Sequence, residues 1–280
     1  MEKFTIWTED DSRRFIATPT SADDKYSRGV LGVIAGSRQY PGAAVLACEG
    51  AMQTGVGMVR YSGPRIARML VLRQCPEIVI ESGQVQAWLI GPGIDFGKVG
   101  RRRRRLIENA VDQKVPMILD AGAISLTSRV AAPTLITPHF RELSSLLALA
   151  NIEVDATEIQ AAPRKWALRA ASEFGVCVLL KGTQTVVASG EIAIEMPSAP
   201  AWLATAGTGD VLSGILGALL ATQSDQVRKR PEFFAGLAAT GSWIHSEAAR
   251  TASQGGPISA LTLSSAIPKV IGKLLTHSET

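Results

Sequence analysis

The stretch LATAGTGDVLSGILGALLA, from Leu203 to Ala221, joins a glycine-rich turn to a strongly apolar run, with one acid between them. Gly207 and Gly209 permit a tight turn, and the run that starts at Val211 predicts a buried helix. Burying an unpaired carboxylate beside such a helix would be costly. Asp210 is therefore expected either to cap the helix or to do chemistry at its start.

The start of a helix presents unpaired N–H groups and a partial positive charge, which suit a phosphate or a developing anion. An acid at that point is able to act as a general base on a hydroxyl group. The structural alternative is an N-cap, which stabilises a helix by about 1 kcal/mol. The spacing GTGD alone leaves both interpretations of Asp210 open.

Short apolar runs alternate with helical stretches along the rest of the chain. We predict strands at residues 30–36, 58–63, 77–80, 88–93, 116–124, 134–140 and 176–182, then a hairpin about Gly190. We predict helices from about residue 42, at 101–113, 141–149 and 165–174, and two or three more after the glycine-rich turn. This alternation is typical of an α/β fold whose parallel sheet is covered on both faces.

No linker or change of composition divides the chain, so residues 1–280 are expected to form one domain, with residues 1–27 as an extended lead-in. The 46% of apolar and 19% of charged residues exclude a largely disordered chain. A net charge of +4 fits an anionic small molecule but is too weak to indicate nucleic acid.

Features that the sequence lacks indicate where the protein is located. No apolar run reaches roughly 18 residues, so no membrane span is predicted, and the N-terminus is too polar for a signal peptide. Cys48, Cys75 and Cys177 lack CxxC spacing and are expected to be free buried thiols of a reducing compartment. We therefore expect a cytoplasmic protein.

Ligands of open α/β sheets bind beyond the carboxyl ends of the strands, and isolated polar residues follow several predicted strands. Asp120 ends one of them. Lys181 ends another, where its ammonium suits a phosphate oxygen or is simply solvated in a hairpin. His139 follows Pro138, where it either contacts a ligand or is structural. A metal site is not predicted, because His139, His245 and His277 are far apart in the sequence.

Other motifs are less informative. The run Arg101–Arg105 is interpreted as a solvated helix face, since no aromatic residues interleave it. Trp202 is expected to stack on a base or to pack in the core. The chain contains no GxxxxGK[ST], GxGxxG or GxSxG, which disfavours P-loop, Rossmann-dehydrogenase and nucleophile-elbow chemistry.

Six segments in a fixed order carry a resemblance that no single segment carries. They are GVIAGSRQYPGAAVLACEGAMQTGVGMVRY (32–61), IGPG (90–93), ILDAGAISL (118–126), TPHFRELSSLL (137–147), VLLKGTQTVVAS (178–189) and LATAGTGDVLSGILGALLA (203–221). The chain, over roughly residues 25–270, resembles the ADP/ATP-dependent NAD(P)H-hydrate dehydratases of the ribokinase-like superfamily. It differs from them at residues 24–29 and at Gly122, where relatives often have a second acid.

The resemblance implies a ribokinase-like three-layer α/β/α sandwich with a mostly parallel central sheet. It implies a hydro-lyase that repairs hydrated NADH or NADPH (NADHX or NADPHX). ADP or ATP, with Mg²⁺, would phosphorylate the hydrate hydroxyl. Elimination of phosphate would then restore NAD(P)H, with release of AMP or ADP.

The resemblance also implies site residues by position. Asp210 would be the catalytic base on the hydrate hydroxyl, and the anion hole would comprise Gly207, Thr208 and Gly209. The hydrated nicotinamide would be bound by Ala43, Gly93, His139 and Asp210. The adenine nucleotide would be bound by Lys181, Gly182, Thr183, Gln184, Thr185 and Gly209.

The family further implies a homotetramer. Because 280 residues leave no room for a fused epimerase domain, we expect a separate NAD(P)H-hydrate epimerase as functional partner. Two alternatives stay open: a small-molecule kinase of the same superfamily that acts on a vitamin precursor or a sugar, and a non-catalytic nucleotide-binding protein. The sequence does not determine whether ADP or ATP, or NADHX or NADPHX, is preferred.

Overall fold

A computed structural model of the chain describes residues 5–230 and 232–276. In those residues nine strands form one sheet in the order β1-β9-β8-β7-β6-β5-β4-β2-β3. Strand β8 runs antiparallel to both of its neighbours, and every other pair of neighbouring strands is parallel. The strands are β1 (Thr5–Ile6), β2 (Val30–Ile34), β3 (Met58–Ser62), β4 (Ala87–Ile90), β5 (Met117–Leu119), β6 (Thr134–Ile136), β7 (Cys177–Leu180), β8 (Val186–Ser189) and β9 (Ile192–Glu195).

Helices connect most of the parallel strands. The α-helices are α1 (Glu9–Arg13), α2 (Pro41–Gln53), α3 (Arg65–Gln74), α4 (Arg101–Asp112), α5 (Phe140–Ala148), α6 (Ala156–Ala161), α7 (Pro163–Phe174), α8 (Thr208–Thr222), α9 (Ser224–Lys229), α10 (Phe233–Ser253) and α11 (Ala260–Thr276). The short 3-10 helices are η1 (Phe96–Lys98), η2 (Ala121–Arg129) and η3 (Ala201–Leu203). Across the described ranges, no helix combines the length and the apolar character needed to cross a membrane.

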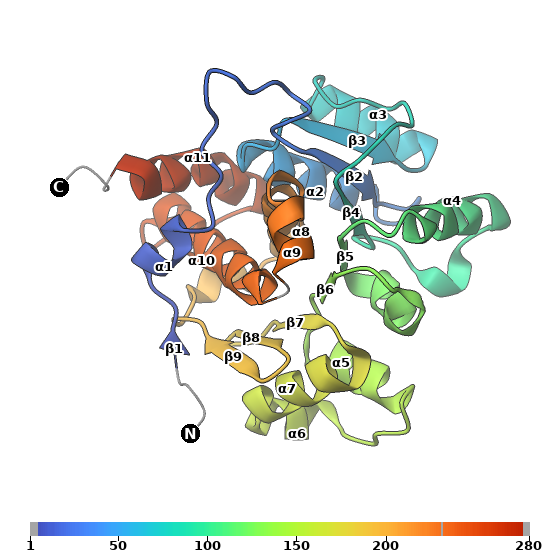
Figure 1. The fold of residues 1–280 in the computed structure, drawn as a ribbon, viewed down its shortest axis with the longest axis vertical. Coiled ribbons are helices and arrows are strands. Elements are labelled where there is room, and N and C mark those ends of the chain that lie inside the picture. Colours follow the sequence, from blue (N-terminus) through green and yellow to red (C-terminus); the bar gives the residue numbers. More distant parts are fainter. Residues whose placement is uncertain (1–4, 231, 277–280) are drawn as a thin grey trace.

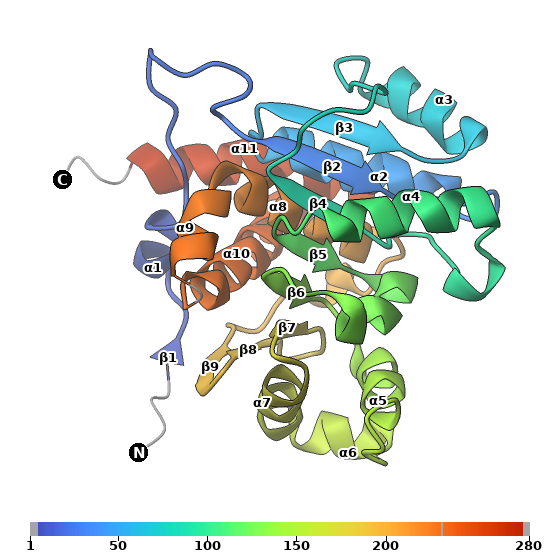
Figure 2. The same cartoon turned by 45° about the vertical axis from the view of Figure 1, so that its right-hand side comes forward.

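The two faces of the sheet carry separate hydrophobic cores because alternate residues of a strand point to opposite faces. In β2, Leu31 and Val33 face the core formed with α2, α3, α8, α10 and α11. Val30 and Ile34 face the second core, which is formed with η2 and helices α4 to α7. Figure 1 and Figure 2 show α8, α10 and α11 on one side of the strands and α4 and α5 on the other. The predicted α/β/α sandwich with a mostly parallel sheet is therefore confirmed.

Helices α2 and α8 pack closely because glycines bring their backbones together. A Cβ at Gly214 of α8 would overlap the carbonyl oxygen of Ala47 on α2. In return, a Cβ at Gly50 would lie 2.6 Å from the carbonyl oxygen of Val211. This contact holds the first turn of α8 against the helix that follows β2.

Three predictions about the fold were wrong. Residues 77–80 form a single bridge between Val79 and Arg60 and no strand, because the pairing with β3 is limited to the N–H and carbonyl groups of Val79. Residue ranges 5–6 and 9–13 of the expected lead-in form β1 and α1, whose N-cap Thr8 exchanges hydrogen bonds with Asp11. Four helices, instead of two or three, follow the glycine-rich turn within residues 208–230 and 232–276.

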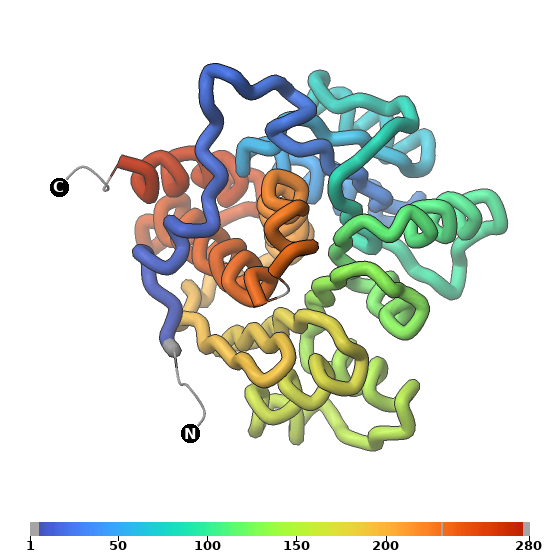
Figure 3. The backbone as a smooth tube through the Cα atoms, viewed as in Figure 1, coloured from blue at the N-terminus to red at the C-terminus, as the bar shows by residue number. Residues whose placement is uncertain are grey.

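The N-terminal part of the chain links distant elements. Helix α1 packs on α10 and α11, where the ring of Phe15 lies 4.5 Å from that of Phe233, centroid to centroid. Figure 3 follows the blue segment after α1 across the helices to the start of β2. The N-terminal segment is thus tied to the C-terminal helices.

Candidate active site

The order of strands reverses at the carboxyl ends of β2 and β4. From β2 the chain connects to β3 on one side, and β4 then pairs with the other side of β2. Such a switch point is where open α/β sheets bind ligands. Here the Gly36 N–H donates to the carbonyl oxygen of Pro92 at 2.7 Å. Gly93 has a φ of +67°, and a Cβ there would lie 2.6 Å from the Cβ of Ala43. The structure therefore brings the predicted substrate residues Ala43 and Gly93 into contact.

A buried acid lies next to this switch point. Asp120 follows β5 and is only 3% exposed. It contacts the segment 91–93, since a Cβ at Gly91, whose φ is +129°, would overlap its carbonyl oxygen. The backbone of Asp120 thus packs against Gly91, two residues before Gly93.

Asp120 accepts hydrogen bonds from three different elements. Its Oδ1 accepts from the Thr137 hydroxyl after β6 at 2.6 Å and from Lys181 Nζ after β7 at 3.0 Å. Its Oδ2 accepts from the Ser213 hydroxyl of α8 at 2.7 Å. Burial would by itself raise the pKa of Asp120, but Lys181 and the two hydroxyls hold it below its ordinary value. Asp120 is therefore a fixed negative charge.

Lys181 is held in a complementary way. Burial would by itself lower its pKa, but Asp120, Glu142 and Asp210 hold that pKa above its ordinary value. A Cβ at Gly209 would lie 4.0 Å from Lys181 Nζ, so the ammonium is close to the first turn of α8. The alternative of a solvated hairpin lysine is wrong, because Lys181 is paired with a buried carboxylate.

Asp210 is the third residue of α8 and is partly buried. The N-cap is Gly207, with a φ of +92° that favours glycine, so the interpretation of Asp210 as an N-cap is wrong. Burial and the nearby charge of Asp120 raise the pKa of Asp210 to about 7, against the opposing effect of Lys181. A carboxyl group with such a pKa is able to take up and release a proton near neutral pH.

Thr208, another residue of the predicted anion hole, is held by the preceding turn and by α10. The Thr208 hydroxyl is 2.9 Å from the carbonyl oxygens of Leu203 and Thr205, so it is engaged in the turn. His245 of α10 donates from Nε2 to the Thr208 carbonyl oxygen at 2.8 Å. Burial lowers the pKa of His245 to about 4, so this histidine is neutral at pH 7 and supports the turn without adding charge.

The predicted nucleotide segment 181–185 connects β7 to β8. Gly182, Thr183 and Gln184 are exposed, and the Gln184 amide donates to Glu195 of β9 at 2.9 Å. Gly182 lies against the ring of Phe140, the first residue of α5. This segment begins beside the first turn of α8 and extends to the surface, so the structure brings Lys181 to Asp210 and leaves the side chains of Thr183 and Gln184 outside that cluster.

His139 has a structural role that the sequence analysis left open. It is the N-cap of α5: its Nδ1 accepts from the backbone N–H of Glu142 at 3.2 Å, and its own N–H donates to the Glu142 carboxylate. Its side chain is nevertheless 52% exposed. It lines a groove of about 460 Å³ with Ala121, Gly122, Ile124, Ser125, Arg141, Glu142, Ser145, Leu146 and Leu149.

Other predictions have mixed outcomes. Trp202 is 43% exposed, so it does not pack in the core. Four arginines of the run 101–105 are exposed, as predicted, but Arg103 is partly buried and donates to the carbonyl oxygen of Ala35 after β2. The three cysteines are buried and free, as predicted. His277 lies outside the described residues, and within those residues no three His, Cys, Asp or Glu side chains are grouped to hold a metal ion.

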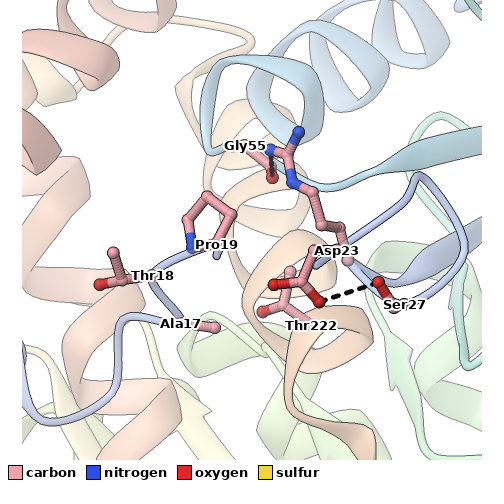
Figure 4. Close-up of a pocket in the computed structure, with 8 residues that line it drawn as sticks. Ala17, Thr18, Pro19, Asp23, Ser27, Gly55 and Thr222 are labelled. Atoms are coloured by element: carbon pink, nitrogen blue, oxygen red, sulfur yellow. Dashed lines mark hydrogen bonds between the residues drawn. The ribbon is translucent and has the colours of Figure 1, made fainter. Parts of the chain in front are cut away.

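A second cavity of about 200 Å³ is lined by residues that precede β2 and β3 and by Thr222 at the end of α8 (Figure 4). Ser27 donates to Asp23 there, and Arg28 donates to the carbonyl oxygen of Gly55. Gly55 precedes β3, and the cavity is therefore far from the carboxyl ends where Asp120 and Lys181 meet.

The sequence analysis placed Asp120 at the end of a predicted strand without giving it a role, and it did not single out Thr137 or Ser213. The first two were visible as polar residues directly after buried strands, in LDAG and TPH. Ser213 lies one helical turn after Asp210, inside an apolar run, and nothing in the sequence marks it. Their convergence depends on the parallel register of β5, β6 and β7.

Comparisons with known proteins show the family of the chain. Residues 31–269 match the family model described as NAD(P)H-hydrate dehydratase. The chain is 36% identical over 286 residues to the bifunctional NAD(P)H-hydrate repair enzyme of Corynebacterium glutamicum, which covers 91% of this chain and 49% of that protein. It is 34% identical over 242 residues to the ADP-dependent (S)-NAD(P)H-hydrate dehydratase of Neisseria meningitidis, covering 79% of this chain and 76% of that one.

Solved structures share the fold. The ADP/ATP-dependent NAD(P)H-hydrate dehydratase of Bacillus subtilis, co-crystallised with ATP and Mg²⁺, matches with a TM-score of 0.82 at 25% identity and covers 98% of this chain and 100% of that one. A ribokinase-like superfamily protein of Enterococcus faecalis matches with a TM-score of 0.82 at 22% identity, over 97% of this chain and 96% of that one, which supports the predicted ribokinase-like fold. The chain spans about half the length of the bifunctional relatives.

Proposed function

We propose that this chain, which belongs to the NAD(P)H-hydrate dehydratase family, catalyses the ADP- or ATP-dependent dehydration of hydrated NADH or NADPH. The observation that supports this proposal best is the position of Asp210. Its partly buried carboxyl group lies in the first turn of α8, with its pKa raised to about 7 by burial and by Asp120. Such an acid beside a glycine turn and a lysine suits phosphoryl transfer to a hydroxyl group.

In the proposed reaction the hydrate hydroxyl loses its proton to Asp210 while its oxygen attacks the terminal phosphorus of the nucleotide. AMP or ADP leaves as the new phosphorus–oxygen bond forms. Phosphate then departs with the electrons of the carbon–oxygen bond, and the neighbouring carbon loses a proton, so that the double bond of NAD(P)H is restored. The coenzyme thus loses the elements of one water, whose oxygen leaves in the phosphate as the nucleotide is cleaved, and this makes the enzyme a hydro-lyase.

The chain's own groups divide this work. In this proposal the glycine turn at residues 207–209 stabilises the charge that develops on the transferred phosphoryl group through the backbone N–H groups of Gly207 and Gly209, since the Thr208 N–H donates to the Thr205 carbonyl oxygen. Lys181 supplies a point charge for the nucleotide phosphates, and segment 182–185 supplies further contacts. Ala43, Gly93 and His139 line the hydrated nicotinamide in this proposal, at the switch point of the sheet.

Mg²⁺ is proposed to accompany the nucleotide. It is held in proteins by one or two carboxylates together with substrate phosphates, so a dedicated cluster of acids is not required. The nucleotide phosphates would supply most of its ligands here, because the oxygens of Asp120 are engaged by Thr137, Lys181 and Ser213, and Asp210 is the proposed base. When bound, the ion neutralises charge on the phosphates.

The family also underlies three further proposals: a cytoplasmic location, a homotetramer, and a separate NAD(P)H-hydrate epimerase as functional partner. They are tested by fractionation of cells, by light scattering, and by adding an epimerase to a mixture of the two hydrate epimers and measuring how much more of it is consumed.

The direct test mixes the purified protein with hydrated NADH or NADPH, Mg²⁺, and either ADP or ATP. The proposal predicts recovery of the absorbance of the reduced nicotinamide, together with release of phosphate. A stable phosphate ester without that recovery would instead identify a small-molecule kinase. Nucleotide binding without turnover of either hydrate, and without phosphorylation of a vitamin precursor or a sugar offered in its place, would identify a non-catalytic protein.

A further inference from the structure

Asp120 has no role in the reaction just described, although it lies at the centre of the site. It is a buried carboxylate that accepts hydrogen bonds from the ends of β6 and β7 and from α8. We propose that Asp120 is a positioning residue, which fixes the Lys181 ammonium beside the first turn of α8 and keeps it from pairing with Asp210. This proposal deepens the proposed function and rests on it.

The geometry gives Asp120 control of the lysine. A lysine side chain has four flexible carbons, so its ammonium is placed only where a partner holds it. Asp120 Oδ1 holds Nζ at 3.0 Å, and the Thr137 hydroxyl orients the same oxygen. The second oxygen accepts from Ser213, one turn into α8 from Asp210, so the same carboxylate also connects α8 to the sheet.

The charges explain why this arrangement matters for Asp210. Three ionisable groups meet here, and the two partners of Lys181 compete for it: Asp120 and Asp210 both raise its pKa, as does Glu142 of α5. The remaining neighbour, His245 of α10, is neutral at pH 7. If Lys181 paired directly with Asp210, it would stabilise the Asp210 carboxylate and weaken it as a base.

Because Asp120 takes the lysine and adds a negative charge of its own, Asp210 keeps a proton affinity suited to neutral pH. The lysine stays available to the nucleotide on the side away from Asp120. The buried Asp120 carboxylate therefore keeps Asp210 available as a base and Lys181 available as a phosphate-binding cation.

The test is a pH titration of the aspartate carboxyl carbons by ¹³C NMR in the ligand-free protein, with resonances assigned from Asp210→Asn and Asp120→Asn. In the parent protein we expect Asp210 to titrate near pH 7 and Asp120 to stay ionised throughout that range. In Asp120→Asn we expect the midpoint of Asp210 to fall by roughly one pH unit or more, because a like charge is lost and Lys181 is freed.

Glu49→Gln is the matched control, because it also converts a buried acid to an amide. Glu49 lies on α2 and accepts hydrogen bonds from Gln53 and from the Cys75 thiol. We expect this variant to leave the midpoint of Asp210 unchanged. An unchanged or higher midpoint in Asp120→Asn, or an equal fall in Glu49→Gln, would overturn the proposal.

The titration needs no substrate, so its result is independent of whether the protein is a dehydratase. If the parent turns over the hydrate, the acidic limb of its rate profile should move to lower pH in Asp120→Asn, and the affinity for nucleotide should fall. If Asp120→Asn does not fold, the parent titration decides: an Asp120 that titrates together with Asp210, or an Asp210 that titrates near pH 4, contradicts the proposal.

Discussion

At the scale of a single residue, the burial that raises the pKa of Asp210 also lowers the stability of the protein once this carboxyl group is ionised. Its folded pKa is raised to about 7, whereas an unfolded aspartate titrates near about 3.9. Between these values the folded protein holds a proton that the unfolded chain has released. The free energy of unfolding therefore falls as the pH rises through this window, and the loss is complete above about pH 7. The ionised form needed for proton abstraction is thus the less stable one.

The first prediction follows from that linkage. Asp210→Asn should be more stable than the parent at pH 8, by about 1 to 3 kcal/mol. The gain should shrink as the pH falls to 5 and vanish near pH 4, as measured by urea unfolding across the range. Glu191→Gln, which changes an exposed acid of the β8–β9 turn, is the control and should show no such trend. A gain that is the same at every pH would contradict the raised pKa.

Lys181 gives a second prediction at this scale. Lys181→Ala should weaken ADP or ATP binding by at least about tenfold, as expected for loss of a charged hydrogen bond, and hydrate binding much less. It should also destabilise the protein, because Asp120 is left buried without its cation. Adding Asp120→Asn should restore the stability but not the nucleotide affinity. Titration calorimetry measures the affinity of each variant for nucleotide and for hydrate. Equal losses of affinity for the two ligands would contradict the assignment of Lys181 to the nucleotide.

The residues of the site were predictable from the sequence only in part. Lys181 and Asp210 stood out because each is a charged residue beside glycines and a buried element. The partner of Lys181 did not, since Asp120 is 61 residues away and the pairing depends on the register of three strands. His139 was predicted at the site by resemblance, whereas its capping of α5 is a local feature of HFRE that the sequence also carries.

At the scale of elements, the crossing of α2 and α8 places the glycine-rich turn beside the switch point. Gly214 and Gly50 permit that crossing because their missing side chains leave room for the backbone of the other helix. The strands were predictable because each is a short apolar run. The segment 77–80 is also a short apolar run but forms only one bridge with β3, and composition does not show that difference.

The crossing gives a third prediction. Gly214→Ala should destabilise the protein by about 1 to 3 kcal/mol or more, because the added methyl group overlaps the Ala47 carbonyl oxygen. Gly272→Ala is the matched control: Gly272 lies inside α11, and a Cβ there meets nothing within 4 Å. It should stabilise the protein by about 0.5 to 1 kcal/mol, the gain in helix propensity. Similar losses in thermal unfolding for both variants would contradict the packing account.

At the scale of the whole molecule, the order of the strands brings the residues of the candidate site together. Residues that are far apart in the sequence, from Ala43 to Asp210, reach one edge because the strands that precede them are parallel. The alternation of apolar strands and helices in the sequence predicted that ligands bind at the carboxyl ends of the strands. The order of strands, the pairing of β1 with β9, and the packing of α1 on the last two helices were not predictable, because they depend on contacts between segments about 190 to 260 residues apart.

The central claim is that a lone acid in the first turn of α8 removes a proton while phosphorus is transferred. The most direct measurement compares the parent with Asp210→Asn in the recovery of NADH from its hydrate at saturating ADP or ATP and Mg²⁺, with nucleotide binding measured on the same samples. We predict a loss of turnover of about 10² to 10⁴-fold in the variant, with nucleotide binding retained. A folded variant that restores NADH as fast as the parent would contradict the account.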